Sequence, residues 1–111
     1  RVLQDLQQAW GQNITGWVSG GDCSLAYGVN CNAQGMVIDI YQNYQGLTGY
    51  IPDYISALDR LTFLELAGNN LTGSIPSIIG NMIGLERIDL SYNALTGSVP
   101  SNISNLSNLV D

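Results

Sequence analysis

Apolar residues recur along this chain with a period of 24 residues. Residues 61–84 can be laid over residues 85–108 without a gap, so that Leu64 aligns with Ile88. Other positions keep the same interval: Leu66 with Leu90, Leu71 with Leu95, and the prolines Pro52, Pro76 and Pro100. Self-similarity at a fixed period of this size is typical of one supersecondary unit stacked repeatedly. The pattern therefore predicts an α/β repeat solenoid.

Each repeat predicts a short strand, a turn and a second turn on the opposite side. Leu64 and Leu66 alternate inward, which is typical of a strand that pairs with its neighbours about 4.8 Å away in a parallel sheet. Asn69 then turns the chain, and we expect its side-chain amide and that of Asn93 to bond backbone groups of adjacent turns as a ladder. The Ile-Pro pair that follows leads into a helical or 3₁₀ turn on the convex side.

Residues 1–35 predict a cap of different sequence. Residues 1–10 have the apolar spacing of an amphipathic helix, which Gly11 ends, and a short strand is expected at residues 36–41. Stacked repeats cannot bury their own ends, so an unlike terminal unit has to cover the first repeat.

The predicted repeats after the cap are residues 36–60, 61–84 and 85–108, with residues 109–111 beginning another. The first copy is imperfect, because seven residues lead from Ile40 to Leu47 where the later copies have five. This count predicts a two-residue insertion around Tyr44 and Gln45, which should bulge the turn beside the sheet.

The charges exclude several functions. The chain has no His and three Lys and Arg together against nine carboxylates, with a net charge of -6. Phosphate backbones and anionic lipid surfaces require clustered cations, so neither nucleic acid nor membrane contact is expected. Without an imidazole or an amine, paired carboxylates are the one catalytic option left. We favour no enzyme over that one option and expect no cofactor. Because the chain has no His to act as a ligand, we also expect no metal site.

Cys23 and Cys31 form either a local disulfide or a pair of free thiols. Four N-x-[ST] sequons occur, at Asn13, Asn70, Asn102 and Asn105. Sequons and a disulfide both point to an oxidising compartment, so the disulfide is favoured, with a stabilisation of about 2.5 kcal/mol. Asn70 and Asn102 are the glycan sites expected first, since one flanks the ladder Asn and the other lies on the convex turn.

Alternation along the strands predicts the residues of the concave surface. The candidates for ligand contact are Asp39, Tyr41, Phe63, Glu65, Arg87, Asp89, Ser91 and Tyr92. Asp39, Glu65 and Asp89 are expected to form a row of carboxylates that binds a cation or a basic peptide, or that is a solvated acidic face. Exposed aromatic residues suit protein or carbohydrate contact, although they could equally cover the repeat edges.

The motif LxxLxLxxNxLTGxIP, preceded by a helix, a Trp and a CxxxxxxxC pair, resembles the plant-type leucine-rich repeat family with its amino-terminal cap. Similar proteins include the ectodomains of receptor-like kinases and receptor-like proteins, and polygalacturonase inhibitors. The resemblance implies a right-handed superhelix whose concave sheet binds peptides, small hormones, cell-wall enzymes or a co-receptor. The cap departs from the family pattern, because its cysteine spacing is one residue longer and Ala26 stands where a Trp is usual. Tyr27 is the residue expected to replace that packing.

These observations predict an extracellular recognition module for a protein, a peptide or a cell-wall glycan. We expect a fragment of a longer ectodomain or secreted inhibitor, because the last apolar side chains would lie on an uncovered end. The alternative is a structural, self-assembling secreted glycoprotein in which that end stacks on another copy.

Overall fold

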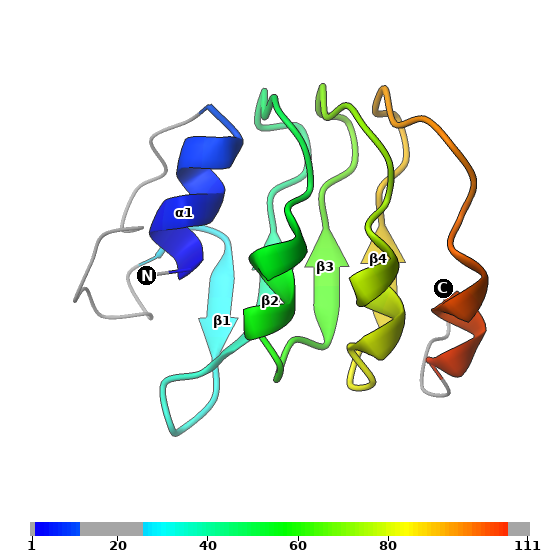
Figure 1. Cartoon of the computed structure of the whole chain (residues 1–111). Coiled ribbons are helices and arrows are strands. Elements are labelled where there is room, and N and C mark those ends of the chain that lie inside the picture. The colour runs from blue at the N-terminus through cyan, green and yellow to red at the C-terminus, as the bar shows by residue number, and fades with distance from the viewer. Residues whose placement is uncertain (1, 12–25, 107–111) are drawn as a thin grey trace.

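The computed structural model describes residues 2–11 and 26–106, which form a row of stacked coils (Figure 1). The strands are β1 (Val29–Cys31), β2 (Val37–Tyr41), β3 (Phe63–Glu65) and β4 (Arg87–Asp89). The helical elements are α1 (Val2–Ala9) and three 3₁₀ turns: η2 (Asp53–Ala57), η3 (Ser77–Asn81) and η4 (Ser101–Asn105). Within the described residues the strand order is β1-β2-β3-β4, with β1 antiparallel to β2 and the other pairs parallel. The helix, the parallel strands and the 3₁₀ turns were all predicted; the short strand β1 was not.

The register of the sheet corrects the expected insertion in the first repeat. Ile40 pairs with Leu64, and Leu64 pairs with Ile88, so all three coils keep the 24-residue period through the strands. The prediction of two extra residues was wrong because it aligned Ile40 with the second inward leucine of the later repeats. That position is held by Gln42, which is fully buried.

Gln42 replaces an inward leucine and joins the first coil to the cap. Its Nε2 donates to the Tyr27 carbonyl at 2.6 Å, so the buried amide binds backbone just before β1. Gly28 lies so close to the Gln42 amide that a Cβ there would collide with it. Tyr27 itself is 53% exposed, so it does not provide the packing expected in place of the family Trp.

The core lies between the sheet and the 3₁₀ turns, which lie in front of the strands in Figure 1. Aligned apolar residues from successive layers fill it, among them Leu6, Trp10, Ile40, Leu64, Leu66, Leu71 and Ile79. At about 1.5–3 kcal/mol for each fully buried aliphatic side chain, this column is the main stabilising contribution.

The asparagine ladder is confirmed. The Asn69 Nδ2 donates to the carbonyls of Gln42 and Leu66, both at 2.9 Å, and its Oδ1 accepts from the amides of Gln45 and Leu47. Asn93 repeats the arrangement one coil later, with donation to the Leu66 carbonyl at 2.9 Å. One amide side chain thereby satisfies backbone groups of two successive coils, beside the backbone hydrogen bonds that join those coils directly, such as that from the Tyr44 amide to the Ala67 carbonyl at 2.8 Å.

The helix α1 takes the place of a preceding coil. Between coils, the Thr72 amide donates to the Gly49 carbonyl, and at the cap the Thr48 amide donates to the Trp10 carbonyl in the same way. Trp10 is fully buried and its Nε1 donates to the Tyr50 carbonyl at 2.9 Å. Trp17 and Cys23 lie outside the described residues, so the Cys23–Cys31 disulfide stays a prediction.

At the other end of the described part, the equivalents of fully buried leucines are partly exposed. Leu64 and Leu71 are fully buried, whereas Ile88 and Leu95 are partly exposed and Val99 is 62% exposed. Ile88, Leu95 and Val99 line an open groove of about 530 Å³.

Candidate ligand-binding face

The strand register arranges the concave face in two rows. One row is Asp39, Phe63 and Arg87, and the other is Tyr41, Glu65 and Asp89. All six side chains are half-buried, as expected for residues flanked on both sides within a sheet. We call these six residues the concave face.

The expected row of three carboxylates is therefore wrong. Asp39 lies opposite Phe63, whereas Glu65 lies opposite Asp89 in the neighbouring row. The error has the same cause as the supposed insertion, because a shift of two residues leaves a side chain on the same face but moves it along the strand. The face holds one isolated carboxylate and one pair.

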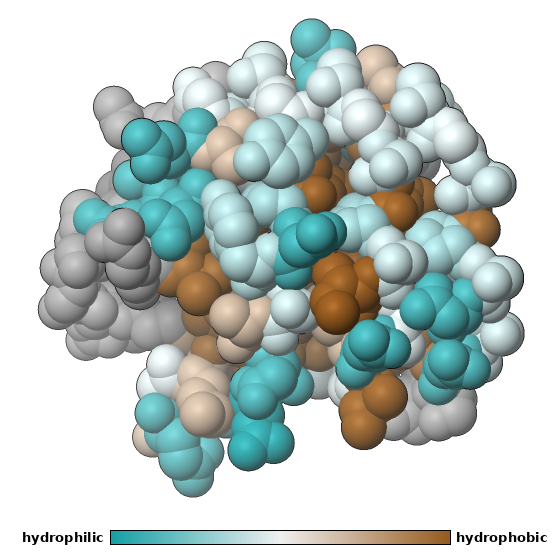
Figure 2. Space-filling view, viewed as in Figure 1, coloured by the Kyte–Doolittle hydropathy of each residue, from teal (hydrophilic) through white to brown (hydrophobic). Residues whose placement is uncertain are grey.

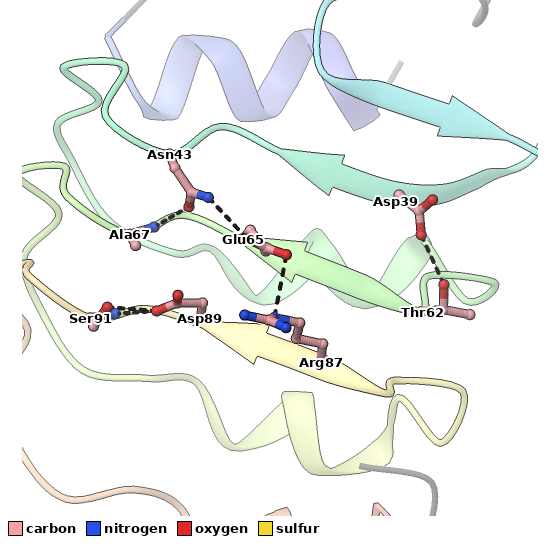
Figure 3. A network of polar contacts seen from close by, with 8 residues as sticks. All are labelled: Asp39, Asn43, Thr62, Glu65, Ala67, Arg87, Asp89 and Ser91. Atoms are coloured by element: carbon pink, nitrogen blue, oxygen red, sulfur yellow. Dashed lines mark hydrogen bonds and ion pairs between the residues drawn. The ribbon is translucent and has the colours of Figure 1, made fainter. Parts of the chain in front are cut away.

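A polar network connects Glu65 of this pair to its neighbours (Figure 3). The Arg87 Nε lies 3.4 Å from the Glu65 Oε2, a distance that describes an ion pair more than a well-formed hydrogen bond. On its other side, Glu65 accepts a hydrogen bond of 3.0 Å from the Asn43 Nδ2. The Asn43 Oδ1 in turn accepts from the Ala67 amide at 2.7 Å, which holds the asparagine across two coils.

The two aspartates are held by neutral groups. Asp39 accepts from the Thr62 hydroxyl at 3.0 Å and from the Asn30 amide at 3.1 Å. Asp89 accepts from the hydroxyl of Ser91 at 2.6 Å and from its backbone amide at 3.1 Å. The Ser91 hydroxyl, followed by the Ser91 amide, lowers the pKa of Asp89, which keeps this carboxylate charged.

Aromatic rings lie beside the charges. Tyr41 and Phe63 meet edge to face, with ring centroids 6.2 Å apart. Burial raises the pKa of Tyr41, and the carboxylates of Asp39 and Glu65 raise it further while Arg87 lowers it. The Tyr41 hydroxyl therefore stays protonated near neutral pH and can donate a hydrogen bond.

Two exposed tyrosines, Tyr44 and Tyr92, occupy the turn after the strands, and we call them the rim tyrosines. They are 70% and 80% exposed and have left-handed backbones, with φ of 56° and 55°. Gly68 holds the equivalent position between them with φ of 71°. The Tyr44 ring packs so closely on Gly68 that a Cβ there would collide with it. Bulky residues rarely adopt positive φ, and such conformations concentrate at functional sites.

The structure thus brings together the strand residues predicted for ligand contact and adds others. Ser91 and Tyr92 lie just beyond β4, at the edge of the concave face. Asn43 and Thr62 were missed, although counting 24 residues back from Ala67 would have found Asn43. Among the sequons, Asn70 and Asn105 are exposed and Asn102 is half-buried, while Asn13 lies outside the described residues.

Neither a metal cluster nor a membrane span is found in the part of the chain described. Residues 2–11 and 26–106 contain no group of three or more His, Cys, Asp or Glu side chains arranged to hold a metal ion. None of the helices there has both the length and the apolar character needed to cross a bilayer.

Comparisons with known proteins agree with this architecture. The profile of the Leucine Rich Repeat family matches residues 60–82 and 84–106, which are the second and third coils. Residues 60–106 therefore carry leucine-rich repeats, and solved plant ectodomains with such repeats align with nearly the whole chain.

Plant receptor kinases are among the proteins to which the chain is similar. The chain is 35% identical over 69 residues to a probable leucine-rich repeat receptor-like protein kinase of Arabidopsis thaliana, a match that covers 61% of this chain and 7% of that protein. The ectodomain of the receptor kinase GASSHO1/SCHENGEN3 from Arabidopsis thaliana, solved with CASPARIAN STRIP INTEGRITY FACTOR 2, has a TM-score of 0.85 at 32% identity. That alignment covers 97% of this chain and 14% of the ectodomain.

The ectodomain of the receptor kinase SOBIR1, also from Arabidopsis thaliana, has a TM-score of 0.82 at 31% identity. The alignment covers 96% of this chain and 60% of that ectodomain. The chain therefore spans a small part of the curated relative and less than two thirds of these solved structures.

Proposed function

We propose that this chain is an extracellular recognition module that binds a protein or peptide ligand along its concave face. The observation that carries the proposal is the register of β2, β3 and β4, which sets aromatic, anionic and cationic side chains in two partly exposed rows. Support comes from the similarity to plant receptor ectodomains, one of which was solved with CASPARIAN STRIP INTEGRITY FACTOR 2. In contrast, the face that carries the 3₁₀ turns shows scattered apolar patches with no continuous apolar area (Figure 2).

The charges of the concave face favour a ligand with a basic side chain beside an apolar one. The face has three carboxylates and one guanidinium, and the net charge of the chain is -6. Glu65 is already compensated by Arg87 and Asn43, whereas Asp89 is held by neutral groups of Ser91. A ligand cation near Asp89, with an apolar group on the Tyr41–Phe63 pair, would satisfy both parts of the face.

The proposal is tested with peptides selected from a random display library on the immobilised chain. The peptides should be enriched in Lys and Arg, and Glu65→Gln combined with Asp89→Asn should weaken their binding about tenfold or more, the effect of losing roughly 1.4 kcal/mol. Asp53→Asn, which removes an exposed carboxylate from η2 on the opposite side, is the matched control and should leave Kd unchanged. Equal binding to the double variant and to the wild type would sink the proposal.

We also propose that the repeats belong to the LTGxIP subclass of the family. The extracellular assignment carries one further expectation, which is that Cys23 and Cys31 form a disulfide. Secreted protein should gain the mass of two alkyl groups only when it is reduced before alkylation. Alkylation without reduction would contradict the disulfide and leave the ligand-binding proposal standing.

A second candidate function is self-assembly through the apolar groove beside η4. Ile88, Leu90 and Leu95 are partly exposed there, and Val99 is 62% exposed. If copies stack on this groove, sedimentation should show oligomers whose fraction rises with concentration and which Val99→Asp abolishes. A monomer at all concentrations would exclude this function.

A further inference from the structure

We propose that the side chain of Asn102 is a structural clamp between coils, and that N-linked glycans are carried by Asn70 and Asn105. The inference rests on the proposed extracellular function, since this modification takes place in the secretory pathway. All three asparagines stand in N-x-[ST] sequons, so the sequence motif alone does not separate them.

The side-chain amide of Asn102 is held by one hydrogen bond and by the burial of its oxygen. Its Nδ2, the atom that a glycan would modify, donates to the Ser77 carbonyl of the preceding coil at 2.8 Å. Its Oδ1 is buried and accepts no hydrogen bond among the described residues. Attachment of a sugar to Nδ2 would place a bulky group at the contact between η3 and η4 and separate the two turns.

Gly80 shows that the clamp is built into the packing. A Cβ added to Gly80 would collide with the Asn102 amide, so the glycine makes room for that side chain. The equivalent residues in the neighbouring coils are Ser56 and Ser104, neither of which is glycine. The glycine thus occurs in the second coil, against which the Asn102 side chain of the third coil packs.

The same position in the first coil also reaches back to the preceding layer. Tyr54, which is 48 residues before Asn102, donates its hydroxyl to the Asp5 carbonyl of α1 at 2.8 Å. Two polar side chains at this position of the repeat therefore bond a backbone carbonyl one layer earlier. This recurrence favours a packing role for Asn102.

Asn70 has the opposite surroundings. It is exposed, and its backbone amide donates to the Leu47 carbonyl at 2.8 Å, which fixes the backbone and leaves the side chain to point outward. The equivalent residues one coil away are Gly46, which has no side chain, and Ala94, which has a methyl group, so neither presents a bulky side chain at the neighbouring positions. Asn105 is exposed at the end of η4.

The test is site-resolved glycan mapping of the full chain, secreted from insect cells behind an added leader peptide. Trimming each glycan to one sugar marks the occupied asparagines for peptide mass spectrometry. We expect sugar on Asn70 and Asn105 and unmodified Asn102 in the folded, secreted fraction. A glycan on Asn102 in that fraction, or an unmodified Asn70, would overturn the inference.

Two variants separate the clamp from the sequon. Ser104→Ala destroys the Asn102 sequon and keeps the Asn102 amide, so it should not change the number of glycans. It also removes the exposed hydrogen bond from the Ser104 hydroxyl to the Ser101 carbonyl, so its melting temperature should fall by less than that of Asn102→Asp. Asn102→Asp keeps the shape but removes the donor to Ser77, and should lower the melting temperature by about 4 °C. Loss of a glycan in Ser104→Ala, or an unchanged melting temperature in Asn102→Asp, would contradict the clamp. Peptide binding, measured on the same preparations, tests the proposed function independently.

Discussion

Replacing Tyr92 with glycine is expected to stabilise the fold and to weaken ligand binding. Tyr92 has φ of 55°, in the left-handed region where the Cβ of an L-residue crowds the backbone. Its ring is 80% exposed and contributes little burial. The residue therefore costs conformational energy that packing does not offset, as expected where a side chain is kept for contact with a partner.

The magnitude follows from two opposing contributions. Relief of the left-handed conformation should gain about 1–2 kcal/mol. The greater freedom of glycine in the unfolded chain costs about 0.5–1 kcal/mol. The net gain is about 0–1.5 kcal/mol, and the midpoints of the two ranges give about 0.75 kcal/mol, or an increase of about 3 °C in melting temperature. Tyr44→Gly should gain less, because the Tyr44 ring packs on Gly68 and that contact is lost.

The assay is urea denaturation, in which the midpoint should rise at constant m-value. Tyr50→Gly is the matched control, since Tyr50 is 52% exposed and is not among the residues with positive φ. It should lose about 0.5–1 kcal/mol. If Tyr92→Gly lowers the midpoint as much as Tyr50→Gly does, the strain argument is refuted. If peptides bind the Tyr92→Gly variant as tightly as the wild type, the rim tyrosines are not part of the site.

Asn69→Ala should lower the unfolding free energy by about 3 kcal/mol or more, because backbone groups of two coils lose their partner; a loss below about 1 kcal/mol in urea denaturation would contradict the ladder. Ser91→Ala should bring the pKa of Asp89 back toward its usual range in an NMR titration, since the Ser91 hydroxyl is the main cause of the lowered value. A lowered pKa stabilises the fold above about pH 4 and stops doing so as the pH falls through the folded value, so the stability advantage of the wild type over Ser91→Ala should disappear in strong acid. A difference that grows with acidity would contradict this sign. Gln42→Ala should cost about 2–4 kcal/mol, because it opens a cavity and removes the hydrogen bond from the Gln42 Nε2 to the Tyr27 carbonyl. Hydrogen exchange should then be faster at β1 than at β4, and uniform exchange would argue against a role of Gln42 in joining the first coil to the cap.

Much of the architecture could be predicted because each repeat meets the same neighbours. A residue such as Leu71 recurs at the same place in every coil, so the period alone identifies it as inward. The ladder role of Asn69 was predictable for the same reason, since one amide bonds the same backbone groups in each turn. The strand β1 was missed because three residues, Val29–Cys31, are too short to show a pattern of their own.

The first coil shows where pattern reading failed. Gln42 is polar and yet fully buried, so its position looked like part of a turn and the alignment moved by two residues. Burial is possible because the Tyr27 carbonyl, fifteen residues earlier, accepts the amide. Nothing in the local sequence reveals that partner, since it is brought there by the antiparallel pairing of β1 with β2.

By itself, the sequence determined the repeat, its inward residues, its ladder and the set of side chains on one face of the sheet. These are properties of single coils, which the period makes visible. Only the tertiary structure decided the rows of the concave face, the pairing of Glu65 with Arg87 and the clamp at Asn102. Those features depend on the register between coils, which backbone hydrogen bonds and close packing set, and a residue pattern read along the chain does not contain that information.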